Sequence, residues 1–388
     1  AARLRFFHHS SAISVQATLR NTSRAIHPGG LWDLGDPGSR FIKDWSFTLT
    51  LPSPVGGRAA RVSAEVGQPA VPLGMPGELY QESSGGAQWQ SRVHINRTGV
   101  VPLQMRGYRL RDASTEVRGL RATPVATVSD GTSQVSVAHR QFWQRFPKAI
   151  EITDDQLSLK LLPGQFPDLH ELQGGEQITE EFVVCFGQDT VTEEPLEWVR
   201  SPLRVELGPD WYRRAEAMPY LGPRGGTDDP DYYALVDAAI EGDHAFDRKR
   251  ERIDEYGWRH FGDLYADHEN TRNPSAEPFI SHYNNQYDAI AGFAAQYFRS
   301  GDERWRELMD DLARHVIDID IYHTAEDKPA YNGGMFWHTA HYVDAGKSTH
   351  RTYPSTGAGG SGGPSAEHNY NTGLMLLYFM TGDVRARD

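Results

Sequence analysis

The sequence has one cysteine and no long apolar run. Cys185 stands alone among 388 residues, which excludes an internal disulfide and a cysteine-based zinc site. It lies in the apolar run 182–186, so we predict a buried structural thiol. No run of about 18 apolar residues occurs, so no membrane span or membrane partner is expected. The first residues lack the apolar core of a signal peptide. We expect a soluble protein, either secreted or cytoplasmic.

Positive charge is scarce in the second half of the chain. Residues 206–388 contain 18 Lys and Arg against 31 Asp and Glu, so they account for the whole net charge of −13. Nucleic acid is excluded as a partner because phosphate binding needs clustered cations. An anionic ligand would need a local cationic pocket that overrides this field.

Residues 1–207 have the pattern of an antiparallel β domain. Apolar residues alternate with polar ones over 13–19, 45–51 and 182–186, which predicts strands with one buried face. Turn signals such as Asp130-Gly131 separate the runs. We therefore predict one large β-sandwich domain over 1–207. A segment rich in Pro and Gly, 208–230, is predicted to be an irregular linker.

From residue 231 the apolar spacing becomes helical, and an internal repeat appears. Residues 292–304 match 373–385 in register, with Gly, Tyr, Phe, Ser/Thr, Gly, Asp and Arg recurring. Gly301 and Gly382 would end a helix in the left-handed conformation, and the following Asp would cap the next helix. Repeated helical hairpins that share a core form solenoids or toroids. We predict the N-terminal part of an α/α-toroid over 231–388, incomplete because a closed ring needs more helices.

The segment richest in potentially catalytic side chains lies between the two repeat copies. The stretch 331–353, followed by 367–371, holds four of the 16 histidines with aromatics and amides. Such side chains suit sugar rings, which offer apolar faces and hydroxyl edges. Two smaller clusters, 258–269 and 282–288, precede the first repeat helix. We predict that these loops meet at one rim of the toroid.

Metal binding stays open as an alternative in two places. Carboxylates and histidines of 258–269 could form a site, and His338, His341 and Asp344 have a ligand spacing if helical. Gly333 and Gly334 argue against that helix, so we expect no metal and no cofactor. A divalent cation such as calcium remains the alternative.

Long, unusual stretches of the chain resemble the exo-rhamnogalacturonan lyase family (polysaccharide lyase family 26) and its YetA-like bacterial relatives. The matching stretches are 30–38, 142–148, 170–176, 261–263, 283–288, 313–324 and 331–344. The resemblance implies a small β-barrel, a central β-sandwich and a C-terminal α/α-toroid, of which this chain would lack most of the barrel and part of the toroid. It also implies cleavage of an acidic, uronate-containing polysaccharide or oligosaccharide, such as the rhamnogalacturonan of pectin, by β-elimination.

That chemistry assigns roles by residue type. A cation or amide must neutralise the uronate carboxylate, and His or Tyr must move the protons. The candidates for the first role are Arg351, Lys347, Asn369 and His338. The candidates for proton transfer are His341, Tyr342, His350, His368 and Tyr370. The candidates for further substrate contacts are Arg259, His260, His282, Tyr283, Asn284, Asn285, Trp337 and Asn371.

Two other classes of protein fit the same pattern. A glycoside hydrolase on this scaffold would use a pair of carboxyl groups. Asp263, Asp267, Glu269, Asp344 and Glu367 would be the candidates. A non-catalytic carbohydrate-binding protein would bind sugars without turnover. The sequence does not predict the oligomeric state.

Overall fold

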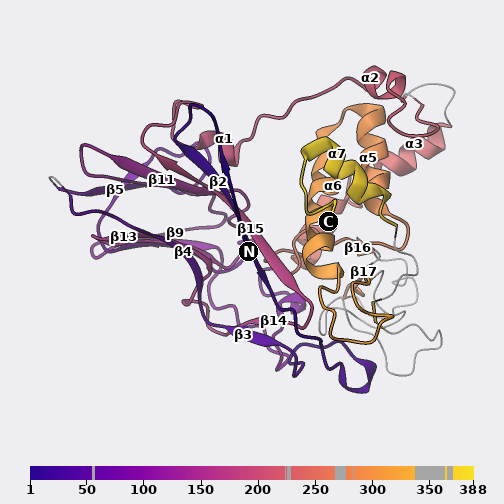
Figure 1. The fold of residues 1–388 in the computed structure, drawn as a ribbon, viewed down its shortest axis with the longest axis horizontal. Helices are drawn as coiled ribbons and strands as arrows, with labels where there is room; N and C mark the ends of the chain where they lie inside the picture. The colour runs from indigo at the N-terminus through magenta and orange to yellow at the C-terminus, as the bar shows by residue number, and fades with distance from the viewer. Residues whose placement is uncertain are drawn as a thin grey trace.

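The computed structural model describes residues 1–54, 57–222, 224, 229–266, 277–282, 284–336, 363–364 and 370–388. Its first part is built from β-sheets and its second mainly from helices (Figure 1). The combination of antiparallel sheets with a helical region confirms the predicted mixture of β and α structure.

Two antiparallel sheets form the first part. One sheet has the order β1-β2-β15-β11-β10-β5-β6, and the other has the order β4-β13-β12-β7-β8-β9. The strands are β1 (Ala2–Phe6), β2 (Ala12–Arg20), β3 (Arg40–Ile42), β4 (Trp45–Thr50), β5 (Ala59–Ser63), β6 (Val71–Leu73), β7 (Gly77–Gln81), β8 (Tyr108–Arg111), β9 (Glu116–Gly119), β10 (Val125–Ser129), β11 (Gln134–His139), β12 (Lys148–Ile152), β13 (Gln156–Leu162), β14 (His170–Leu172) and β15 (Gln177–Phe186). The short strands β3 and β14 pair with each other.

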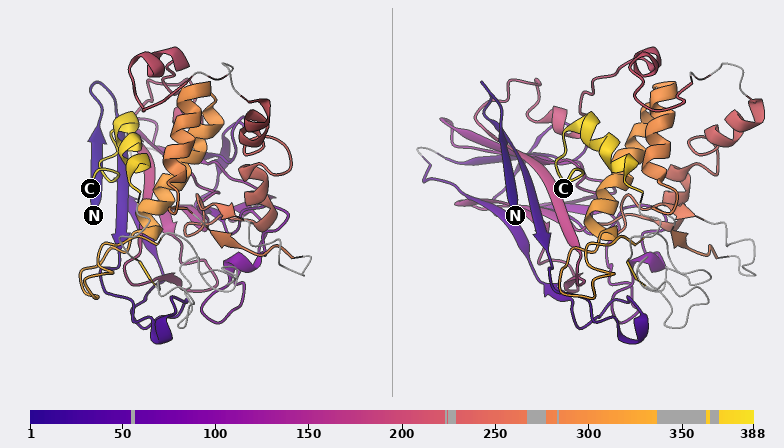
Figure 2. Two further views of the ribbon diagram at one scale, coloured as in Figure 1. Left: turned by 90° about the vertical axis from the view of Figure 1, so that its right-hand side faces the viewer. Right: turned by 45° about the vertical axis from the view of Figure 1, so that its right-hand side comes forward.

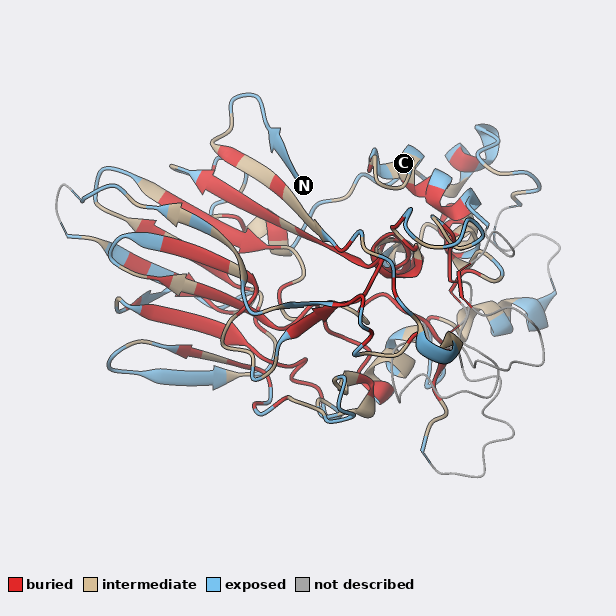
Figure 3. Cartoon of the chain, turned by 60° about the horizontal axis from the view of Figure 1, so that its bottom comes forward, coloured by how far each residue is buried: buried red, intermediate tan, exposed pale blue. Residues whose placement is uncertain are grey.

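The two sheets enclose a shared core, as expected for a sandwich. Val62, Val137 and Val184 of one sheet pack with Leu79 and Ile150 of the other. Figure 3 shows the buried residues running along these strands. Cys185 is buried, as predicted, and its Sγ lies 3.2 Å from Ser11 Oγ. The alternation of apolar residues thus identifies the strands because it follows the inward face of each sheet.

Helices dominate the second part. They are α2 (Pro209–Arg214), α3 (Pro230–Asp237), α4 (Phe246–Ile253), α5 (Ala289–Ser300), α6 (Glu303–His315), the π-helix η4 (Val316–Asp320) and α7 (Thr372–Thr381). The short helix α1 (Glu197–Arg200) belongs to the β region, where its Val199 packs with Ala138 and Val183. Two 3₁₀ turns, η1 (Pro28–Gly30) and η2 (Arg92–His94), lie in the β region, and a small hairpin of β16 (Tyr265–Ala266) and β17 (Ser281–His282) precedes α5. The hairpin was not predicted. The linker was predicted to be irregular, but it contains α2, which starts on Pro209 because proline suits the first helical position.

The two repeat copies have the same local hydrogen bonds. Helix α5 ends on Gly301 at φ 71° and α7 ends on Gly382 at φ 68°, which confirms the predicted left-handed ends. Asp302 Oδ1 accepts a hydrogen bond from Arg304 N at 3.0 Å, and Asp383 Oδ1 accepts one from Arg385 N at 3.1 Å. The first corner continues into α6, whereas turns follow the second within the described residues.

Strand β15 joins the sandwich to the helical part. Asp318 of η4 accepts hydrogen bonds from the backbone N and the hydroxyl of Thr179, at 2.9 and 2.8 Å. Glu181 pairs with Arg314 of α6 at 2.7 Å and with Arg385 at 3.0 Å. Figure 2 shows β15 running beside these helices in both views. Within the described residues, none of the helices has the length and apolarity needed to span a bilayer.

Candidate functional site

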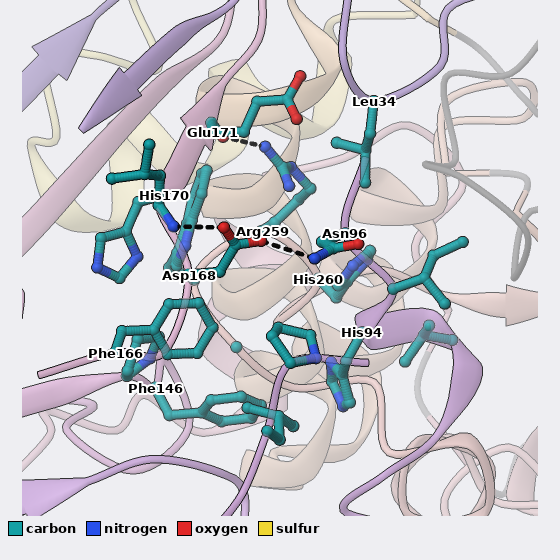
Figure 4. Close-up of a pocket in the computed structure, with 18 of the residues that line it drawn as sticks. Leu34, His94, Asn96, Phe146, Phe166, Asp168, His170, Glu171, Arg259 and His260 are labelled. Carbon is teal, nitrogen blue, oxygen red and sulfur yellow. Dashed lines mark hydrogen bonds between the residues drawn. The ribbon is translucent and has the colours of Figure 1, made fainter. Parts of the chain in front are cut away.

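A cleft opens where loops of the sandwich meet the segment 256–260 that follows α4. Its cavity volume is about 90 Å³, which is small beside the pockets that enclose whole ligands, so it is a shallow surface cleft. Its wall combines aromatic, cationic and amide side chains, several of which Figure 4 labels. The members are Asn96, Arg97, Phe146, Phe166, Asp168, His170, Tyr256, Trp258, Arg259 and His260, with His94 and Glu171 beside them.

Two predicted substrate-binding residues, Arg259 and His260, line this cleft. The guanidinium of Arg259 stacks over the Trp258 ring at 4.5 Å and donates hydrogen bonds to the carbonyl of Glu171 and to Glu176 Oε2, the latter at 3.2 Å. These bonds hold Arg259 against the sandwich. His260 lies with its ring centroid 6.1 Å from that of His94.

Another part of the wall is fixed by short polar contacts. Asp168 accepts a hydrogen bond from Asn96 Nδ2 at 2.7 Å and pairs with Arg97 Nη1 at 3.2 Å. The ring of His170 stacks on Phe166 with centroids 4.9 Å apart. Burial lowers the pKa of His170 to about 4, so its imidazole is neutral near pH 7. The cleft therefore presents rigid aromatic faces and oriented polar groups.

Behind the cleft lies a fully buried group of ionisable residues. It comprises Glu255, Asp263, His282, His315 and Asp320, each at most 4% exposed. They come from separate places in the chain: the segment after α4, the loop before β16, strand β17, the end of α6 and the end of η4. The pairing of Tyr265 with His282 in the β16–β17 hairpin brings two of these segments together, those of Asp263 and His282. We call these five residues the buried cluster.

Imidazoles bridge carboxylates within the buried cluster. His282 Nε2 lies 2.5 Å from Glu255 Oε1 and 3.4 Å from Asp263 Oδ2. His315 Nε2 lies 3.5 Å from Asp263 Oδ2 and 3.5 Å from Asp320 Oδ1. The second oxygen of two of these carboxylates is held by other donors. Asp263 Oδ1 accepts a hydrogen bond from Leu264 N at 2.9 Å, and Asp320 Oδ2 accepts one from each of the Asn284 and Asn285 side chains at 2.9 Å.

The electrostatics of the buried cluster favour positive charge. Burial by itself lowers the pKa of His282, but the carboxylates of Asp263 and Glu255 outweigh it and raise the pKa to about 9. Burial likewise opposes the charged form of His315, and Asp263 with Asp320 overcomes it and raises that pKa. Three carboxylates around two imidazoles thus create a strongly cation-attracting interior.

The predicted site residues divide between this region and parts of the chain that the structure does not describe. His282, Asn284 and Asn285 are buried at or beside the buried cluster. Tyr370 is exposed, and Asn371 precedes α7, where its carbonyl accepts a hydrogen bond from Met375 N. The remaining predicted residues lie outside the described residues: Tyr283, Trp337, His338, His341, Tyr342, Lys347, His350, Arg351, His368 and Asn369.

Both described ends of the predicted catalytic stretch contact the same loop, 284–288. The carbonyl of Phe336 accepts a hydrogen bond from Asn285 Nδ2 at 2.7 Å. At the other end, Gly373 N donates one to Asp288 Oδ2 at 3.0 Å. Phe336 is therefore fixed beside Asn285, which contacts Asp320 of the buried cluster, and the start of α7 is fixed beside Asp288.

Sequence patterns did not identify three members of the buried cluster. His315 fits the apolar face of a helix, and it is indeed buried, but against Asp263 and Asp320 rather than among apolar side chains alone. Glu255 and Asp320 stand in no local motif. Asp263 was a hydrolase candidate, and its burial at 1% exposure removes it from the reach of a bulky sugar. The other four hydrolase candidates lie outside the described residues.

No protein-family model and no curated protein matches the chain.

Proposed function

We propose that the protein is a polysaccharide lyase that cleaves a uronate-containing, rhamnogalacturonan-like polymer by β-elimination. The observation that carries the proposal is the convergence on loop 284–288. Phe336 and Gly373, which flank the stretch rich in His, Tyr, Lys and Arg, are each hydrogen-bonded to it. In this proposal α5, α6 and α7 belong to an α/α-toroid whose rim carries the active site, and the polymer is the protein's partner.

The proposed reaction requires side chains that remove one proton, return one proton and neutralise the carboxylate. A base removes the proton from C5 of the uronate, the electron pair forms the C4–C5 double bond, and the C4–O bond breaks. The departing oxygen takes a proton and becomes a hydroxyl. Arg351, Lys347, Asn369 or His338 would neutralise the carboxylate, and His341, Tyr342, His350, His368 or Tyr370 would move the protons.

The cleft supports the proposal through its chemistry. Phe166 is half-buried and offers apolar surface to a sugar ring, and Asn96, Arg259 and His260 supply polar groups around it. Its charged members, Arg97 and Arg259 against Asp168 and Glu171, balance one another. This cleft is therefore neutral, so the cationic groups that an anionic chain needs would come from Arg351 and Lys347 of the predicted catalytic stretch.

The test is incubation of the protein with rhamnogalacturonan, polygalacturonate and a neutral galactan, followed by ultraviolet absorbance of an unsaturated uronate. The proposal predicts rising absorbance with an acidic polymer and none with galactan. New reducing ends without absorbance would indicate a hydrolase, and binding without new ends would indicate a non-catalytic protein.

A further inference from the structure

We propose that Glu255, Asp263 and His282 bind a divalent transition-metal ion such as Zn²⁺ in the interior of the protein. The potential ligand atoms of these three residues all lie within 4.8 Å of one another, and each residue is buried. The inference is independent of the proposed lyase activity.

The composition of the group fits a borderline metal ion. One imidazole nitrogen and two carboxylate oxygens form a mixed set that zinc and its neighbours accept, whereas calcium and magnesium prefer oxygen alone. His315 provides a second imidazole next to the same oxygen of Asp263. Three or four such ligands match the number that protein zinc sites use.

The separations between the ligand atoms also fit. With metal–ligand bonds of about 2.0–2.2 Å, neighbouring ligand atoms of a tetrahedral site lie roughly 3.3–3.6 Å apart. Asp263 Oδ2 lies 3.4 Å from His282 Nε2 and 3.5 Å from His315 Nε2. The contact of His282 with Glu255 is a hydrogen bond of 2.5 Å, and it would open by about 1 Å to admit the ion.

The surroundings hold two carboxylates in a fixed orientation. Leu264 N donates a hydrogen bond to Oδ1 of Asp263, and Oδ2 of Asp263 faces the two imidazoles. The amides of Asn284 and Asn285 hold Asp320 in the same way behind His315. Outer hydrogen bonds of this kind orient metal ligands and strengthen binding.

Charge balance favours the ion. Buried carboxylates are unfavourable unless a cation compensates their charge. A divalent ion that displaces the proton of His282 would bring Glu255, Asp263 and the neutral imidazole to zero net charge. Asp320 is held separately by the amides of Asn284 and Asn285.

The experiment uses the whole chain after dialysis against a chelator. Zn²⁺ and, separately, Ca²⁺ are added, and bound metal is measured by atomic emission together with the thermal unfolding midpoint. The proposal predicts about one Zn²⁺ per chain with a higher midpoint, and little bound Ca²⁺. Glu255→Gln and His282→Gln should each weaken Zn²⁺ binding by at least about tenfold. Glu307→Gln, at a carboxylate that is 61% exposed on α6, is the matched control and should bind as the parent does.

Failure to bind Zn²⁺, or preference for Ca²⁺, would overturn the proposal. So would Zn²⁺ binding that both cluster variants retain at the parental affinity. If a variant does not fold, the amount of Zn²⁺ bound by the parent protein decides the question alone.

Discussion

Asp288 and Gly373 are hydrogen-bonded across the starts of the two repeated helices. Asp288 Oδ1 accepts from Ala291 N of α5 at 3.1 Å, and its Oδ2 accepts from Gly373 N of α7 at 3.0 Å. A Cβ at Gly373 would lie 2.5 Å from the Ile290 Cβ and 2.6 Å from Ala291 N, so only glycine permits this approach. One carboxylate therefore caps two helices and sets their spacing beside the candidate site.

Replacement of Asp288 should loosen this junction. Asp288→Ala removes the acceptor for both helices and leaves alanine at φ 51°, so we expect a loss of about 2–3 kcal/mol in the free energy of unfolding. Asp288→Asn keeps one acceptor oxygen, and asparagine tolerates the left-handed conformation, so its loss should be about 1 kcal/mol. Urea denaturation measures both. Equal losses in the two variants would contradict the double-cap interpretation.

Two glycines of the first repeat should respond oppositely to the same change. Gly301→Ala places a Cβ at φ 71° and should cost about 1 kcal/mol. Gly292→Ala lies inside α5, where an added Cβ meets nothing within 4 Å, and should stabilise by about 0.5–1 kcal/mol. The denaturation midpoints of the two variants report the signs. A gain at Gly301 would refute its role as a left-handed helix end.

His170 should make stability depend on pH. Its pKa is about 4 in the folded protein because of burial, against about 6.5 in the unfolded chain. Between these values the unfolded chain binds more protons, so stability is complete above pH 6.5 and falls as the pH drops to 4, by up to about 3 kcal/mol.

The measurement is urea denaturation across this pH range for the parent, His170→Gln and, as a control, His244→Gln at an exposed histidine. The stability difference between parent and His170→Gln should shrink as the pH falls. The difference between parent and His244→Gln should stay constant. Parallel curves for all three proteins would show that His170 does not titrate as described.

The predicted catalytic stretch can be tested by substitution. Under the proposed function, His341→Ala, His350→Ala and Arg351→Ala are assayed for turnover on the acidic polymer that the parent cleaves. Loss of the proton-transfer residue should lower the rate by roughly 10²–10⁴, with the circular dichroism spectrum unchanged. His244→Ala is the control and should retain turnover. Near-normal rates in all three variants would place the site elsewhere in the protein.

The sequence predicted local features better than distant contacts. The Gly-Asp corners were predictable because the cap, the left-handed glycine and the serine or threonine lie within a few residues of one another. The sheets were predictable from alternation, which follows from burial of one face. The buried cluster was not, because Asp263 and His282 are brought together by the β16–β17 pairing and Glu255 meets them from the segment after α4, and no local spacing encodes these contacts.

Part of the candidate site nevertheless followed from the repeat. Two helices in register predicted that the loops before them would meet, and the contact of Asp288 with Gly373 confirms that these helix starts are neighbours. The hydrogen bond from Asn285 to the carbonyl of Phe336 shows that the same loop also contacts the residue just before the predicted catalytic stretch. The catalytic roles within that stretch stay predictions, since most of its residues lie outside the described ones.

The most direct test of the proposed lyase reaction is digestion of the acidic polymer followed by mass spectrometry of the fragments. Elimination adds no water across the cleaved bond, so the proposal predicts fragments with an unsaturated uronate at the non-reducing end, each lighter by one water than the corresponding hydrolysis product. Fragments with saturated non-reducing ends and one water added per cleaved bond would contradict it and identify a hydrolase.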